Sequence, residues 1–326
     1  MKKNERLILF FDLEITAESK DDLSPKPLSI KEAFGILERI PKENRIKYTS
    51  NEREALYISE IRQENETIAV LINKSDTTIA DPVLSNPKIK ERRIVSKTPN
   101  EGQDYSSHIL LITNENDPSQ ALALVESCQG LGPSTIKLAL ESIIKNAEST
   151  EPENFKRVHP NGEVDKNGNL RKYKIRHVFN FKAHPSEQFK HDINNGTIHS
   201  IELISRRINN QSFDTEGHFH EESNTLRIKP ANKRSLIGRA FSPLSKMLES
   251  KSNDYDQARI RFKTPEGLER TISYDLHTPS SLEYVKKEII NNFQEDLKSS
   301  YDTIHPTIKK KMQELYEEHI NDRGSA

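Results

Sequence analysis

Cysteine and long apolar runs are scarce in this 326-residue chain. The single cysteine, Cys128, excludes an intramolecular disulfide and a cysteine-based zinc site, and it is typical of a reducing compartment. No apolar run approaches the roughly 18–20 residues that a membrane-spanning helix needs. The N-terminal stretch LILFF follows two lysines, but it is too short for the apolar region of a secretory signal. The sequence therefore predicts a cytoplasmic protein.

Apolar residues are also few, at 33% of the chain. Globular chains usually contain roughly 45–50% when glycine is included, so the cores are expected to be thin. At roughly 100–200 residues per domain, the length predicts two domains. No GxSxG elbow, Walker A loop or GxGxxG motif occurs, and the sequence assigns no catalytic residue, cofactor or metal ligand.

Hydrophobic patterns predict an α+β fold with mainly antiparallel sheets, packed helices and long C-terminal helices. The polar, proline-containing stretch 149–153 is interpreted as a linker. It separates an N-terminal α+β domain, 1–150, which ends in a helical hairpin, from a basic C-terminal α+β domain, 151–326, with a terminal helix pair. Strands are expected at 6–15, 45–49, 55–62, 67–73, 92–96, 107–113, 170–181, 196–206, 224–228, 257–263 and 269–276. Helices are expected at 29–40, 118–129, 133–147 and 232–249, and from about 281 to 319 with a break near Pro306.

Charge is unevenly distributed along the chain, although the net charge is only −1. Residues 156–263 contain 21 Lys/Arg and 12 Asp/Glu, a net charge of +9, and the remainder contains 28 and 38, a net charge of −10. A basic middle segment between acidic segments favours contact with a polyanion. The alternative is a surface that is uneven without a functional reason.

The segment 117–145 resembles the helix–hairpin–helix motif of DNA repair proteins, nucleases and ligases. Its turn reads Gly130-Leu131-Gly132-Pro133, and apolar residues on both sides have helical spacing. Glycines allow backbone to approach a ligand closely, and the free N–H groups at a helix start suit a phosphate. The predicted phosphate contacts are Gly130, Gly132, Ser134, Thr135 and Lys137. An ordinary pair of helices joined by a glycine-rich turn is the alternative.

Cations alternate along several predicted strands, so that they share one face of each strand. The second predicted DNA-binding set lies on these strands and on the helix that follows: Lys172, Lys174, Arg176, Arg227, Lys229, Lys233 and Arg234. Arg259, Arg261 and Lys263 repeat the pattern. Such faces would follow a phosphate backbone and give salt-sensitive binding without sequence preference. The alternative is a solvated outer sheet face, which is common in antiparallel sheets.

Two histidines, His218 and His220, share one face of a predicted extended segment with Glu221 and Glu222 beside them. A catalytic metal site needs such a pair and a third ligand, which the sequence does not identify. A metal-dependent nuclease therefore stays open as an alternative function.

The second half of the chain, from about Gly196 to Lys311, resembles the RexA-like phage-exclusion proteins of lambdoid prophages. The resemblance lies in LRIKP at 226–230, ANKRSLIGRAF at 231–241, DQARIRFKTPEG at 256–267 and ERTISYDL at 269–276, with LINKSDTTI at 71–79 in the first half. The predicted two-domain plan is similar to that of KwaB-like defence proteins. The resemblance implies a DNA-binding defence component that acts with a membrane-protein partner and forms a homodimer.

The sequence thus predicts a protein that binds DNA without sequence specificity and acts as a sensor or regulatory component of an anti-phage exclusion system. Two alternatives are a metal-dependent nuclease and a protein-interaction subunit whose acidic N-terminal domain binds a partner without any nucleic acid.

Overall fold

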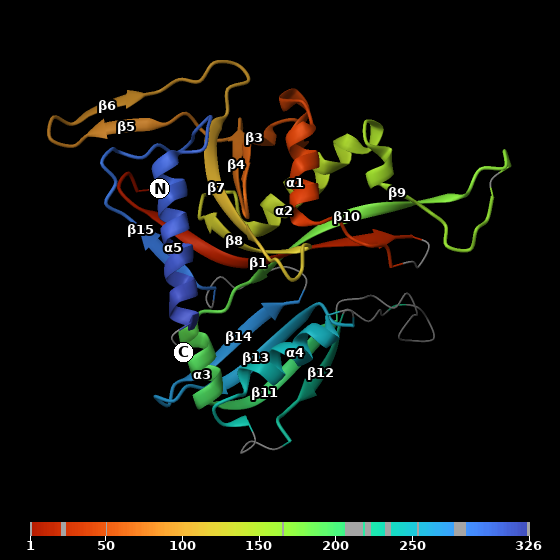
Figure 1. The fold of residues 1–326 in the computed structure, drawn as a ribbon. Helices are drawn as coiled ribbons and strands as arrows, with labels where there is room; N and C mark the ends of the chain where they lie inside the picture. The colour runs from red at the N-terminus through yellow and green to blue at the C-terminus, as the bar shows by residue number, and fades with distance from the viewer. Residues whose placement is uncertain are drawn as a thin grey trace. The chain divides into compact units, whose positions relative to one another are not determined.

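The computed structural model describes residues 2–20, 24–49, 51–164, 166–205, 218, 223–231, 236–252, 254–276 and 285–324. Helices and antiparallel sheets occur together, which confirms the predicted α+β character, and more of the described residues lie in strands than in helices (Figure 1).

The chain forms two compact units. Unit 1 comprises Met1–Asn180 and Glu288–Ala326, and unit 2 comprises Phe181–Lys287. The predicted boundary at 149–153 lies inside unit 1, because the two strands that follow it join the same sheet as the strands that precede it. The compact units therefore differ from the segments 1–150 and 151–326 expected from composition.

Among the described residues, unit 1 is built on a nine-stranded sheet with the order β2-β3-β4-β7-β8-β1-β10-β9, in which β15 also pairs with β1. Neighbouring strands from β2 to β8 pair antiparallel, as do β1 with β8 and β9 with β10. The strands span Arg6–Ser19 (β1), Ile46–Thr49 (β2), Glu54–Glu64 (β3), Thr67–Asp76 (β4), Gln103–Thr113 (β7), Gln120–Glu126 (β8), Lys156–Val158 (β9), Lys172–Ala183 (β10) and Lys287–Ile290 (β15).

One helix of unit 1 begins where its sequence provides a side-chain cap. Helix α1, Ile30–Arg39, starts at Ser29, whose hydroxyl accepts the backbone N–H of Glu32 at 3.2 Å while the Glu32 carboxylate accepts the N–H of Ser29 at 2.8 Å. This reciprocal capping box confirms the predicted start. The other helical segments of unit 1 are η1 (Lys42–Asn44), α2 (Pro133–Ile144), η2 (Lys145–Ser149), η3 (Pro152–Asn154) and α5 (Pro306–Gly324).

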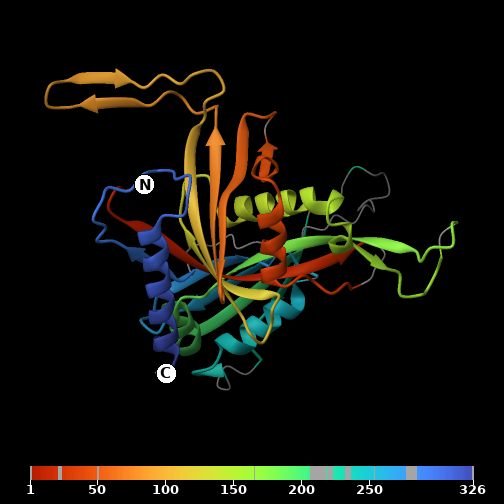
Figure 2. The same ribbon diagram turned by 45° about the horizontal axis from the view of Figure 1, so that its top comes forward.

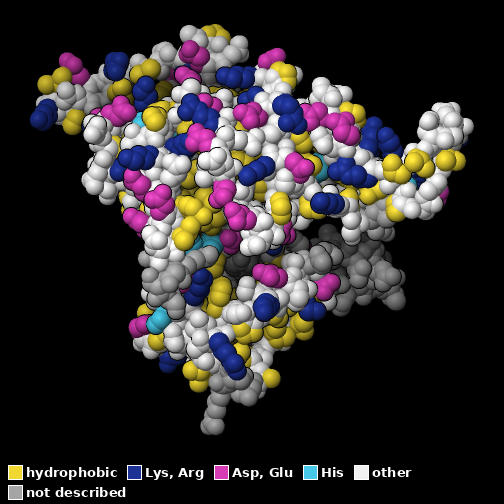
Figure 3. Space-filling model, viewed as in Figure 1, with side chains coloured by type: hydrophobic (Ala, Val, Ile, Leu, Met, Phe, Trp, Pro, Cys, Tyr) yellow, Lys and Arg dark blue, Asp and Glu magenta, His cyan; other side chains and the backbone are white. Residues whose placement is uncertain are grey.

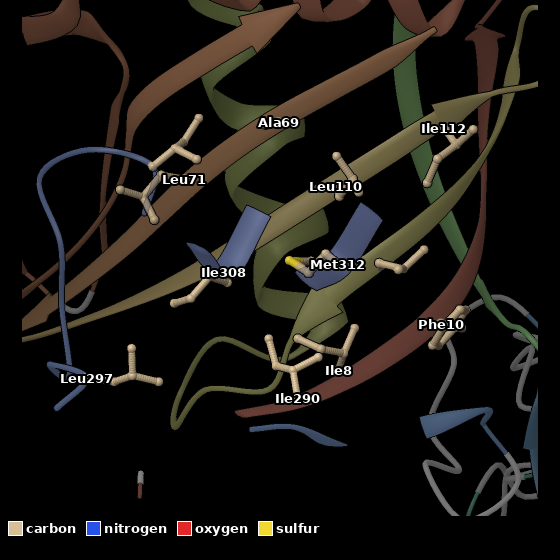
Figure 4. Close-up of a cluster of buried hydrophobic side chains, with 12 residues drawn as sticks. Ile8, Phe10, Ala69, Leu71, Leu110, Ile112, Ile290, Leu297, Ile308 and Met312 are labelled. Carbon is tan, nitrogen blue, oxygen red and sulfur yellow. The ribbon is translucent and has the colours of Figure 1, made fainter. Parts of the chain in front are cut away.

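Both faces of the central sheet in unit 1 are buried. On β1, Phe10 and Phe11 are adjacent and therefore point to opposite faces, yet both are 0% exposed. Phe10 belongs to a core with Ile8, Leu71, Leu110 and residues near the C-terminus (Figure 4). Strands covered on both faces read as continuous apolar runs, which explains the runs in β1, β4 and β7.

The C-terminal part of unit 1 differs from the predicted helix pair. Lys287–Ile290 is strand β15, residues 291–305 are irregular, and one helix, α5, begins at Pro306. Proline fits the first turn of a helix, where its missing N–H removes no hydrogen bond, so Pro306 starts this helix and does not break a longer one. Ile290, Leu297, Ile304, Ile308 and Met312 complete the core of Figure 4.

In the described part of unit 2, a four-stranded antiparallel sheet has the order β12-β11-β13-β14. Apolar side chains of the two helices pack on one face of this sheet, with Leu244 and Leu248 against Ile260 and Phe262. The predicted helix 232–249 only overlaps α4, which begins at Phe241: residues 236–240 are not α-helical, and residues 232–235 lie outside the described residues. The elements are α3 (Glu187–Asn195), β11 (Thr197–Ser205), β12 (Asn224–Ile228), α4 (Phe241–Lys251), β13 (Gln257–Lys263) and β14 (Glu269–Asp275).

Candidate nucleic-acid interface

The predicted first helix of the helix–hairpin–helix motif, residues 118–129, is in fact occupied by strand β8. β8 lies between β7 and β1 and pairs with both. A strand inside a sheet that is covered on both faces is apolar at nearly every position, so the spacing of Leu122 and Val125 also fits a helix. The prediction of two helices around the turn is therefore wrong.

The second half of the predicted motif is present as a turn followed by a helix. Gly130 has a φ of +74°, a conformation that favours glycine, and Gly132 precedes Pro133, the first residue of α2. No side chain caps this helix start, and its first turn carries no acidic residue. Ser134 is exposed and Thr135 is half-buried there. The structure thus brings Gly130, Gly132, Ser134 and Thr135 together at one helix end.

Lys137 contacts the sheet beside α2. Its ammonium group donates to Asn180 Oδ1 at 3.1 Å and lies 3.7 Å from Glu141 Oε1. Its side chain is 24% exposed, so much of it is covered by these neighbours.

The predicted cationic face of β10 exists, but carboxylates neutralise part of it. Lys172, Lys174 and Arg176 are exposed, while Ile175 and His177 are buried on the other face. Lys174 Nζ lies 2.7 Å from Glu148 Oε1, and Arg176 Nη2 lies 2.8 Å from Glu141 Oε2. The hydrogen bond from Lys174 lowers the pKa of Glu148 below its usual value. Among the described residues, Lys172 has no ion-pair partner.

A more strongly basic face lies on the sheet of unit 2, opposite to its two helices. On β13 the exposed residues Arg259, Arg261 and Lys263 alternate with buried Ala258, Ile260 and Phe262, as the sequence predicts. Because alternate residues point to opposite faces, the three cations lie on the face away from α4. We call this surface, with Arg227 from β12, the basic sheet face.

Two carboxylates partly balance the basic sheet face. Glu202 of β11 lies opposite both Arg227 and Arg259 in the strand register. Its carboxylate is 3.7 Å from Arg227 Nε and 3.4 Å from Arg259 Nη1, and Glu269 Oε2 is 3.8 Å from Arg261 Nε. Exposed pairs at these distances are weak, worth about 0–1 kcal/mol, so the arginines can exchange them for a phosphate. Four cations face two carboxylates, which leaves a surplus of positive charge within the described part of this face.

Three further predicted contacts follow β12. Lys229 is exposed just beyond the end of the strand, and it follows Arg227 on the same side by strand alternation. Lys233 and Arg234 lie outside the described residues.

A second group of cations, at 88–93, was not predicted from the sequence, and the structure places it on a separate hairpin. The signal that could have identified it is the basic run Lys88-Ile89-Lys90-Glu91-Arg92-Arg93.

A buried polar network joins β7 and β8 to the C-terminal segment of unit 1. Glu126 Oε2 lies 2.6 Å from His108 Nδ1, and His108 Nε2 accepts the backbone N–H of His305 at 3.0 Å. The carboxylate also pairs with Arg6, and all three side chains of this centre are nearly inaccessible. Because the groups are enclosed and use one another as partners, the network anchors residues near His305 to the sheet.

The histidine pair of the alternative metal site lies largely outside the described residues, as do Glu221 and Glu222. His218 is described and His220 is not, and in the described ranges no group of three or more His, Cys, Asp or Glu residues could hold a metal ion. No helix in the described part of the chain has the length and apolar character needed to cross a bilayer.

Comparison of the chain with protein-family models, with curated proteins and with solved structures finds no match in any of the three.

Proposed function

We propose that this protein binds duplex DNA without sequence specificity, with the basic sheet face of unit 2 as its main contact surface. The observation that carries this proposal is the row of Arg259, Arg261 and Lys263 on one solvent-facing side of β13, with Arg227 on the same side of the sheet. Their side chains extend from an ordered strand, and the nearest carboxylates lie at 3.4 Å or more from the arginines.

Contacts from this face would be to the DNA backbone. Lysine and arginine on a sheet surface reach phosphates, and phosphate contacts fix position without reading sequence. Release of condensed counterions then makes the affinity fall steeply with salt. Lys229 beside β12 and Lys172 on β10 are further candidates for such contacts, and Lys174 and Arg176 would have to exchange their carboxylate partners for phosphate.

We further propose that DNA binding serves a sensing or regulatory role in an anti-phage exclusion system. The support is the resemblance of residues 196–311 to RexA-like proteins. A homodimer and a membrane-protein partner belong to the same proposal.

The test compares two double variants of unit 2 that remove the same charge. Arg259→Gln/Arg261→Gln changes the basic sheet face, and Lys246→Gln/Lys251→Gln changes exposed lysines of α4, which packs on the opposite face. Titrations of several unrelated duplexes over a salt series give the slope of log K against log salt. We expect the first variant to bind all duplexes more weakly and to reduce the slope by about 2, at about 0.9 per lost phosphate contact, and the second to match the wild type.

Two outcomes contradict this function. Absence of a gel shift at low salt would remove nucleic-acid binding altogether and favour a protein-interaction subunit. Equal slopes for both double variants would show that the basic sheet face is not the contact surface.

A further inference from the structure

Within unit 1, strands β5 (Val83–Asn86) and β6 (Glu91–Ile94) form a two-stranded sheet of their own, joined to the nine-stranded sheet at the ends of β4 and β7. Figures 1 and 2 show this hairpin as a separate ribbon that extends away from the nine-stranded sheet. All eight of its strand residues are exposed. We call residues 82–95 the arm. An isolated two-stranded hairpin is marginally stable in water, so the arm is suited to packing against a partner.

Each face of the arm carries an aliphatic side chain and an arginine. The register pairs Val83 with Ile94 and Ser85 with Arg92 on one face. On the other face, Leu84 lies opposite Arg93 and Asn86 opposite Glu91. Val83 and Ile94, which lie opposite each other in the register, are 58% and 63% exposed. Hydrophobic and basic side chains therefore lie next to one another along the arm (Figure 3).

The tip of the arm combines an apolar side chain with two cations. Asn86 Oδ1 accepts the backbone N–H of Lys88 at 3.1 Å, and Lys90 has a φ of +56°, so the turn is closed locally. Ile89, between Lys88 and Lys90, is 59% exposed. The tip thus presents an aliphatic side chain with an ammonium group on each side in sequence.

The arm differs from the other basic surfaces because its charges are not neutralised. Residues 82–95 contain Lys88, Lys90, Arg92 and Arg93 against one acidic residue, Glu91. None of the four cations forms an ion pair with another described residue, whereas Lys174 and Arg176 on β10 do. A surface with this surplus of positive charge is complementary to a polyanion.

We propose that the arm enters the major groove of duplex DNA, with Ile89 against the base edges and the four cations at the phosphates that border the groove. A two-stranded ribbon fits the major groove, which is about 12 Å wide, and one aliphatic side chain there touches base edges without forming the hydrogen bonds that identify a base pair. A symmetric contact between two arms would instead bring the unpaired cations of both copies together, which like-charge repulsion opposes. This inference rests on the proposed function, because it assumes that the chain binds DNA.

The experiment places a DNA-cleaving probe at the tip. In a Cys128→Ala background, Ile89→Cys provides a single thiol for an iron chelate that generates hydroxyl radicals. Tyr48→Cys on β2, where the native side chain is 56% exposed, is the matched control in the same unit. We expect the probe at position 89 to cut both strands of a bound duplex within a few nucleotides, and the probe at position 48 to give only background cleavage. Equal cleavage from the two positions, with the gel shift intact, would overturn the arm proposal and leave the proposed function standing. If the protein gave no gel shift at all, both the arm proposal and the proposed DNA-binding function would be wrong.

A second measurement tests the role of the arm's cations in DNA binding, and tests whether the arm instead contacts a second copy of the chain. Arg92→Gln/Arg93→Gln is compared with Lys31→Gln/Lys42→Gln, which removes the same charge from exposed positions on α1 and η1. We expect the arm variant to reduce the salt slope by about 2 and the control to leave it unchanged. Light scattering follows the oligomeric state of each protein. If the arm variant changed from dimer to monomer while its salt slope stayed that of the wild type, the arm would be a self-association surface and the DNA proposal would be wrong.

Discussion

Arg6 and Glu126 form a buried ion pair in unit 1, with 2.7 Å between Nε and Oε1 and side-chain exposures of 2% and 1%. Arg6 also donates to the carbonyl oxygen of Lys298 at 2.6 Å. The other carboxylate oxygen of Glu126 accepts the backbone N–H of His108 at 3.1 Å. A single buried pair thus links β1, β7 and β8 to the irregular segment 291–305.

Replacing Arg6 alone is expected to destabilise the protein strongly. Arg6→Met leaves the Glu126 carboxylate buried without its cation, and breaking one partner of such a pair costs about 3–5 kcal/mol. The double variant Arg6→Met/Glu126→Leu should recover only part of that loss, because no uncompensated charge remains but the buried N–H of His108 loses its acceptor. Urea unfolding followed by circular dichroism gives the free energy of unfolding of each variant.

The control for this prediction is an exposed ion pair of the same unit. Lys3 Nζ lies 2.9 Å from Asp296 Oδ2, and both side chains are at least 70% exposed. Lys3→Met should cost less than about 1 kcal/mol. Equal losses for Arg6→Met and Lys3→Met would show that burial does not determine the contribution of the first pair.

Gly196, which follows α3, is expected not to tolerate a side chain. A Cβ atom there would lie 2.3 Å from the carbonyl oxygens of both Asp192 and Lys263, and both are backbone atoms. Overpacking of this kind costs about 1–3 kcal/mol in the free energy of unfolding. Gly132→Ala is the control, since nothing lies within 4 Å of a Cβ at that position, and its cost should stay within about 0.5 kcal/mol. A smaller loss for Gly196→Ala than for Gly132→Ala would contradict the packing described for unit 2.

His177 is expected to make the protein less stable as the pH falls. Burial lowers the pKa of its imidazole below 6.5, and the hydrogen bond to the Asn154 carbonyl only partly opposes this. The unfolded chain therefore binds the proton first, so the stability from neutral His177 is complete above about pH 6.5 and decreases as the pH falls toward the folded pKa. Unfolding free energies at pH 7.5 and 5.5 should differ less in His177→Gln than in the wild type. An identical difference in the two proteins would argue against a buried neutral histidine.

Cys128 is expected to react slowly with thiol reagents in the folded protein. Burial, and then the charge of Glu126, raise the pKa of its thiol to about 12. Because the thiolate is the nucleophile, reaction with an aromatic disulfide reagent at pH 8 should be slower than that of an ordinary cysteine by roughly two to three orders of magnitude. Absorbance of the released thiol measures the rate, and denaturation in urea should restore normal reactivity. Glu126→Gln should speed the reaction in the folded state, and a fast reaction in the wild type would disprove the raised pKa.

The sequence was informative where one face of a strand meets solvent. The alternation in Arg259-Ile260-Arg261-Phe262-Lys263 predicted strand β13 together with the face that its cations occupy, and the structure confirms both. A helix covers only the apolar side of this sheet, so the difference between the two faces is visible in the residues themselves.

Secondary structure predicted from the apolar pattern was wrong where tertiary contacts, and not local propensity, determine the backbone conformation. Residues 120–126 are apolar because β8 is surrounded, and their pattern did not distinguish a strand from a helix. Residues 291–305 have apolar side chains that would suit a helix, but their backbone bonds to distant partners: the N–H of Leu297 donates to Lys3 O at 2.7 Å, and the N–H of Ser106 donates to Ser299 O at 3.1 Å. These partners lie in the first third of the chain and leave no trace in the local sequence.

In the candidate interface, too, some features could be predicted from the local sequence and others could not. The cations of β10 were visible in the sequence, but their neutralisation by Glu141 and Glu148 was not, because those residues come from α2 and η2, 26 to 35 positions away. Within the arm, the sequence predicted only a strand at 92–96. Its isolation from the sheet depends on where β4 and β7 pair, which the local sequence does not specify.

Unit 1 is formed by two segments of the chain that flank unit 2 in the sequence, so it cannot be completed until unit 2 has been synthesised. Strands β1, β4, β7 and β8 are translated first, but the side chains that close their shared core, from Ile290 to Met312, leave the ribosome only after all of unit 2 has been made. Unit 2 has a core of its own and can fold during that interval, whereas the early strands wait with an apolar face uncovered. A nascent chain stalled before residue 290 would therefore expose a long aliphatic surface and depend on chaperones to stay in solution.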